Sequence, residues 1–193
     1  MKCTICGIGS VHVQFDGQPL CMDCYNAIMA DKLGVDLPEL PKTFSAADTN
    51  GIQRLFEVER LIMGSAILLT ARERWEHGYE FAVDGELTAD QHTLFDQLKE
   101  KTKRGVSKTY LETGKYSNGQ PYTAVKEHQL IGVLSYNETD SEAPLVIIDG
   151  KPYNWEEVGR LLQAFEGFQL KIEMKELADE YDEMRSIILV TPD

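Results

Sequence analysis

The feature that most constrains this chain is a set of four cysteines confined to its first 24 residues. They form two C-x-x-C pairs, Cys3 with Cys6 and Cys21 with Cys24, separated by fourteen residues, and the rest of the 193-residue chain contains no cysteine. Pairs with this spacing place four thiolates tetrahedrally around a zinc ion. The sequence therefore predicts one structural zinc ion, held by all four cysteines.

Other uses of the cysteines fit the sequence less well. Iron in a rubredoxin-like site is disfavoured because Tyr25 stands where a second knuckle glycine is expected. A redox C-x-x-C needs a βαβ context that this segment lacks. His12 could replace a cysteine, but four thiolates already close the shell. A closed shell leaves no position for water, so we expect the zinc to support folding rather than catalysis.

The residues around the two cysteine pairs predict a small finger. Gly7 follows the first pair as a knuckle residue, and Asp16-Gly17 between two strand-like runs is a hairpin signal. A helical pattern begins at Cys24 and ends at Gly34. Knuckle, hairpin and a second pair at a helix start resemble the treble-clef group of zinc fingers, with zinc ribbons as the alternative. Five residues within the first 34 carry this resemblance: Cys3, Cys6, Gly7, Cys21 and Cys24.

The composition suggests three segments: a zinc finger over residues 1–35, a linker over 36–43 and an α+β domain over 44–193. Pro38 and Pro41 favour an extended linker with little contact between the finger and the main domain. No apolar run reaches the about 20 residues needed to cross a bilayer, and the N-terminus lacks the apolar core of a signal peptide. We therefore expect a cytoplasmic protein with reduced thiols and no membrane contact.

The main domain is predicted to be a mainly antiparallel sheet with two or three helices packed on it. Expected strands are those with alternating or continuous apolar residues: 52–63, 66–75, 79–83, 129–136, 145–148, 168–174 and a short one at 187–190. Asp84-Gly85 and Asp149-Gly150 are expected turns. Helices are expected after a capping box at Thr88–Gln91, after Asn154 as N-cap, and over 175–184. Residues 113–127 are expected to form a loop.

The segment around the second Asp-Gly turn resembles known sequences. Residues 149–157 and 166–169 look like a segment of uncharacterised bacterial proteins that pair an N-terminal zinc finger with a domain of unknown function. This resemblance implies the same two-part organisation over most of the chain. It implies no activity and no site.

The charge distribution bears on possible partners. The formal net charge is −13, and the finger has two lysines, Lys2 and Lys32, against three aspartates. Nucleic-acid binding depends on cations that displace counterions, so we expect no general binding to DNA or RNA. One basic concentration lies at residues 99–115, and within it Lys101, Arg104 and Lys108 share a predicted helical face. This face is interpreted as a solvated surface, a contact for the acidic C-terminal segment, or a contact for a partner.

A search for catalytic motifs finds no phosphate-binding glycine loop and no G-x-S-x-G elbow. His77, His92 and His128 could transfer protons, but no partner constellation accompanies them. No catalytic residue and no cofactor other than zinc is therefore predicted. We expect a non-enzymatic protein-interaction or regulatory module, with protein as its partner. An enzyme without a local motif and a nucleic-acid-associated protein using the 99–108 patch are the alternatives. The oligomeric state is not predicted.

Overall fold

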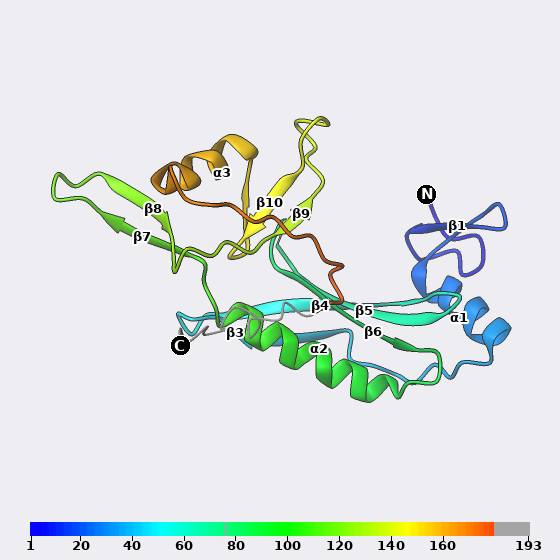
Figure 1. The fold of residues 1–193 in the computed structure, drawn as a ribbon. Helices are drawn as coiled ribbons and strands as arrows, with labels where there is room; N and C mark the ends of the chain where they lie inside the picture. The colour runs from blue at the N-terminus through cyan, green and yellow to red at the C-terminus, as the bar shows by residue number, and fades with distance from the viewer. Residues whose placement is uncertain (76, 180–193) are drawn as a thin grey trace, which may run out of the picture.

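The computed structural model describes residues 1–75 and 77–179, which form three units along the chain (Figure 1). The predicted α+β class is confirmed, although the antiparallel pairing is distributed over four small sheets rather than one. Three α-helices and one 3₁₀ helix lie in the described part of the chain. No helix within it combines the length and apolar character needed to span a bilayer.

The N-terminal unit consists of a hairpin and a helix. Strands β1 (Val13–Phe15) and β2 (Gln18–Leu20) pair antiparallel, and α1 (Met22–Leu33) follows them directly. The predicted Asp16-Gly17 turn is confirmed, because both residues have positive φ values of 49° and 76°. Helix α1 begins two residues earlier than predicted, with Cys21 as its N-cap. Gly34 ends it in the left-handed conformation, as expected.

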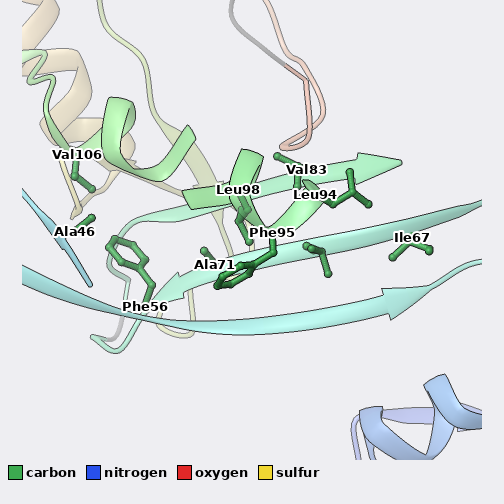
Figure 2. Close-up of a cluster of buried hydrophobic side chains, with 10 residues drawn as sticks. Ala46, Phe56, Ile67, Ala71, Val83, Leu94, Phe95, Leu98 and Val106 are labelled. Carbon is green, nitrogen blue, oxygen red and sulfur yellow. The ribbon is translucent and has the colours of Figure 1, made fainter. Parts of the chain in front are cut away.

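The middle unit is a four-stranded antiparallel sheet with one long helix, α2 (Gln91–Val106), on one face. The strands pair in chain order: β3 (Thr43–Ala47), β4 (Gln53–Ile62), β5 (Ala66–Glu73) and β6 (Glu80–Glu86). The core forms where apolar strand residues such as Phe56 and Ile67 meet Leu94, Phe95 and Leu98 of α2 (Figure 2). The helical spacing of these last three side chains predicted their burial correctly.

Three local predictions for the middle unit are wrong or incomplete. Strand β3 was not predicted, because it is short and follows the two prolines directly. Asp84-Gly85 is not a turn, since it lies inside β6 opposite Leu68 and Ile67. The N-cap of α2 is Asp90 rather than Thr88: the Asp90 carboxylate accepts hydrogen bonds from the backbone N–H groups of His92 and Thr93. A carboxylate can accept from both amides at once, which a hydroxyl does less well.

The C-terminal unit contains two sheets and a short helix. A hairpin joins β7 (Leu111–Lys115) to β8 (Pro121–Val125), and β9 (Val133–Ser135), β10 (Leu145–Ile148) and β11 (Lys151–Tyr153) form the other sheet. Helix α3 (Trp155–Leu162) and the 3₁₀ helix η1 (Gln163–Phe165) follow. Asn154 caps α3 in a full capping box with Glu157, which confirms the predicted N-cap.

Predictions for the C-terminal unit hold only in part. The expected loop over 113–127 is a hairpin, β7 with β8, and the expected strand over 129–136 is shortened to β9. Residues 168–174 form no strand: their backbone is irregular, and Phe168, Leu170, Ile172 and Met174 are all at least 64% exposed. Residues 177–179 form a turn and a bend. The remainder of the helix expected over 175–184, and the strand expected at 187–190, lie outside the described residues.

Candidate functional site

The four predicted cysteines lie together in the N-terminal unit. Their sulfur atoms are all within 4.8 Å of one another, and the Sγ atoms of Cys6 and Cys21 are 3.8 Å apart. Four sulfurs at about 2.3 Å from a zinc ion stand about 3.8 Å apart in a tetrahedron, so the donor set and its spacing fit zinc. His12 lies instead near the carboxylate of Glu59, at 3.8 Å, and is not part of the cluster.

Local backbone structure brings the cysteines together. The knuckle after Cys3 closes through two hydrogen bonds, from the Gly7 N–H to the Cys3 carbonyl and from the Cys3 N–H to the Gly9 carbonyl. The Gly9 N–H also points at the Cys6 sulfur, at 3.4 Å. A Cβ atom at Gly9 would lie 2.7 Å from the Cys21 Cβ, so only glycine lets the first knuckle approach the second pair this closely. The sequence analysis noted Gly7 but missed Gly9.

The cysteines differ in how strongly their surroundings favour the thiolate over the thiol. Hydrogen bonds from the backbone N–H groups of Cys6 and Cys21 lower the pKa of Cys3 to about 6. Those of Gly9 and Ile8 lower the pKa of Cys6, whereas the neighbouring Cys21 thiol and burial raise the pKa of Cys24 to about 12. Thiolates this close repel one another, and a divalent cation among them removes that cost.

The finger is attached to the middle sheet through one buried side chain. Asn26 of α1 is 4% exposed; its Nδ2 donates to the Arg60 carbonyl at 2.6 Å, and its Oδ1 accepts from the Ile62 N–H at 2.9 Å. The linker is held as well. The Gln91 side chain donates to the Asp36 carbonyl and accepts from the Arg60 guanidinium, both at 2.6 Å. The expectation of little contact between finger and main domain is therefore wrong.

A second candidate site is a cavity of ≈ 900 Å³ between the middle and C-terminal units, here named the groove. One wall holds α2 and the segment after it, with Lys101, Arg104 and Lys108. Apolar side chains of β6, β9 and β10 and of the segment before β9 line another part: Phe81, Leu130, Ile131, Val133, Leu134 and Ile147. Residues 172–177 and Asp179 line a further part, and the carboxylates of Glu80 and Asp149 also lie in the lining. The groove thus combines an apolar part with cations on the side of α2 and with carboxylates from β6, the β10–β11 turn and the segment after η1.

The three cations chosen from the sequence line this groove. Lys101 and Arg104 lie on α2, but Lys108 follows the end of that helix, so the predicted common helical face is only partly formed. The other two lysines of the 99–108 patch form ion pairs along α2. Lys99 pairs with Asp96 at 2.7 Å, and Lys103 pairs with Glu100 at 2.6 Å.

The acidic and phenolic groups in the groove have architectural contacts. The Asp149 carboxylate accepts hydrogen bonds from the backbone N–H groups of Tyr110 and Leu111 at 2.9–3.1 Å, which ties the β10–β11 turn to the start of β7. Burial, with the nearby Asp149 charge, raises the pKa of Tyr79 to about 12, so its phenol is protonated at neutral pH. The Tyr79 ring stacks on Phe81 with centroids 5.9 Å apart.

The sequence analysis also missed an ion network beside Tyr79. The Arg54 guanidinium contacts the carboxylates of Asp48 at 2.9 Å and Glu73 at 2.8 Å, and lies over the Tyr79 ring at 5.2 Å. Burial opposes the ionisation of Asp48. The Ile52 and Asn50 N–H groups and the guanidinium outweigh that effect, so the pKa of Asp48 is lowered. These residues lie on three separate segments, which no local motif connects.

The histidines are dispersed. His77 lies in the turn before β6, and His92 in the first turn of α2. His128 packs against the rings of Phe165 and Phe168, with centroids 5.6 and 5.8 Å away. None of the three lines the groove as described.

Comparisons with known proteins add a division of the chain but no activity. Three protein-family models match, each described as a domain of unknown function: DUF7685 over residues 2–36, DUF7686 over 38–107 and DUF7713 over 110–179. The matches follow the three structural units closely. No curated protein matches the chain, and no solved structure matches it.

Proposed function

We propose that this protein is a non-catalytic protein-interaction module whose N-terminal finger is a treble-clef-like structure stabilised by one zinc ion. The support for zinc is the cluster of four sulfur atoms at tetrahedral spacing. The support for the treble-clef arrangement is the order of knuckle, hairpin and helix, with Cys21 at the helix N-terminus. There the free N–H groups and the helix dipole favour a thiolate.

The groove is the interaction surface in this proposal. The observation that carries it is the lining of the ≈ 900 Å³ cavity, in which apolar side chains face Lys101, Arg104 and Lys108. Of its carboxylates, Asp149 accepts from backbone N–H groups and Glu80 pairs with Arg72 at 2.7 Å, and the phenol of Tyr79 keeps its proton. These contacts favour recognition over proton transfer. A protein partner fits better than a nucleic acid, because the net charge of −13 opposes the approach of a polyanion.

Metal analysis tests the first part of the proposal. Protein purified without added zinc should contain one zinc per chain, and Cys24→Ser should lower both the zinc content and its retention against a chelator. A zinc content near zero, with two disulfides found by mass spectrometry, would contradict a structural metal site.

Affinity capture from the native cell tests the second part. The full chain serves as bait beside a charge-reversed variant, Arg104→Glu with Lys108→Glu. A control variant, Lys103→Glu with Lys115→Glu, makes the same charge change outside the groove lining. The proposal expects a protein that binds the wild type and the control but not the groove variant. Equal capture by all three baits would remove the groove as the interaction surface.

A further inference from the structure

The groove already holds a segment of its own chain. Residues 172–179, here named the strap, run from the end of the C-terminal unit to α2 and line the groove (Figure 1). At the far end, the Lys101 ammonium donates three hydrogen bonds, to the carbonyl oxygens of Leu177, Ala178 and Asp179 at 3.0, 2.8 and 2.8 Å. An ammonium has three donors, and three carbonyl groups of the strap accept from this one.

The two ends of the strap are held differently. Within the described part of the chain, its one internal backbone-to-backbone hydrogen bond runs from the Asp179 N–H to the Glu176 carbonyl. Ile172 and Met174 are 69% and 75% exposed, whereas Leu177 and Ala178, beside Lys101, are partly buried. Glu173 pairs with its neighbours Lys171 at 2.9 Å and Lys175 at 3.9 Å. The first part of the strap therefore lacks the backbone ladder and the apolar burial that fix a strand in a sheet, and a competing segment could replace it there.

The chemistry of the strap indicates what the groove accepts. It carries three carboxylates, Glu173, Glu176 and Asp179, against one lysine, Lys175. The facing wall carries Lys101, Arg104 and Lys108. Strap and wall are thus complementary in charge, and four apolar residues, Ile172, Met174, Leu177 and Ala178, stand between the charged residues of the strap.

We propose that the strap is an intramolecular stand-in for the partner, and that the partner presents an acidic segment that also carries apolar side chains. In the closed protein the strap occupies the wall of α2. The partner segment displaces it, offers its backbone carbonyls to Lys101 and places its carboxylates against Arg104 and Lys108. The apparent affinity for the partner is then the intrinsic affinity multiplied by the fraction of molecules in which the strap is released, so a strap that is mostly bound weakens binding. This inference rests on the proposed function and adds the class of partner and a built-in competitor.

The test measures binding of a fluorescein-labelled peptide with the sequence of residues 168–179 to the full-length protein, by fluorescence anisotropy. One variant replaces residues 172–178 with a glycine-serine stretch of equal length, which removes the competitor and leaves the facing wall intact. Its control is Glu138→Ser, in the exposed β9–β10 loop, which removes the same net charge. We expect the strap variant to bind the peptide at least tenfold more tightly than the wild type, and the control to match the wild type.

Two further arms complete the experiment. Arg104→Glu with Lys108→Glu, added to the strap variant, should weaken peptide binding at least tenfold, and a scrambled peptide should bind less well. Equal peptide affinity in the wild type and the strap variant would overturn the inference, as would equal binding of the scrambled peptide. Duplex DNA that binds more tightly than the peptide would assign the groove to nucleic acid. A negative peptide result beside a successful cellular capture overturns the strap inference alone.

Discussion

The buried amide of Asn26 should couple the stability of the finger to that of the middle sheet, and Asn26→Ala tests this. The substitution leaves the Arg60 carbonyl and the Ile62 N–H without their partner at the end of β4. Ile62 is fully buried, so its N–H has poor access to water. A buried polar group left unpaired costs about 1–3 kcal/mol, so two of them predict a loss of about 2–6 kcal/mol in the free energy of unfolding.

Urea unfolding followed by circular dichroism measures this loss, with and without a zinc chelator. In the wild type, chelation should lower the stability of the middle unit as well as that of the finger, because α1 is attached to β4. In Asn26→Ala the middle unit should respond less to chelation. Hydrogen exchange at residues 59–62 reports the same coupling locally, with protection lost on chelation in the wild type.

Asn118→Ala is the matched control, because the Asn118 side chain makes one hydrogen bond in an exposed turn, to the Gln120 N–H. It should cost well under half as much as Asn26→Ala. The coupling would be refuted if both substitutions had the same effect, or if chelation of the wild type changed exchange only within residues 1–34. The second result would restore the independent finger that the two linker prolines predict.

Backbone packing, the Arg54 ion network and the net charge each lead to an expected result. Gly105→Ala should destabilise the protein by about 1–3 kcal/mol in thermal unfolding, because a Cβ there would lie 2.1 Å from the Phe81 ring. Gly159→Ala, in open space on α3, is the control and should stabilise the protein by up to about 1 kcal/mol. Equal effects of the two substitutions would contradict this packing. Because the pKa of Asp48 is lowered in the folded protein, its contribution to stability is complete above the ordinary aspartate pKa and is lost as the pH falls through the lower, folded-state value. Arg54→Met should therefore move the midpoint of acid unfolding to higher pH. An unchanged midpoint would count against the ion network. Filter binding at about 0.15 M salt should detect no affinity for mixed-sequence duplex DNA or RNA, and submicromolar binding would reverse that expectation.

Local signals predicted the elements that depend on neighbouring residues. The cysteine spacing, the Asp16-Gly17 turn and the Asn154 cap each involve a few adjacent positions and appear as expected. Alternation at 168–174 failed because a period of two indicates a strand only where a sheet edge is available to pair with it. At the start of α2 the capping-box pattern pointed to Thr88 as N-cap, whereas the structure uses Asp90, two residues later.

The groove could not be predicted, for a different reason. Its walls come from β6, α2, the segments around β9 and β10, and the strap, which are far apart in the chain. The sequence identified Lys101, Arg104 and Lys108 as a group and offered the acidic C-terminal segment as one contact for them, but it did not indicate the apolar residues that share the groove. Asn26 gave no signal at all, because it is one of five asparagines until its contacts with the end of β4 are known.

The contacts of Tyr79 bear on how this chain can be divided. Gly150, in the β10–β11 turn, lies so close to the Tyr79 ring that a Cβ on it would stand 2.6 Å from the ring, and Gly105 of α2 lies still more tightly against Phe81, at 2.1 Å. A fragment cut at residues 38 and 107 would keep its own core but expose the Tyr79 ring and leave the Arg60 carbonyl without Asn26. Each unit thus has surface residues that pack against the next unit. If one unit is exchanged between related chains, the residue that it contacts in the neighbouring unit must be exchanged as well.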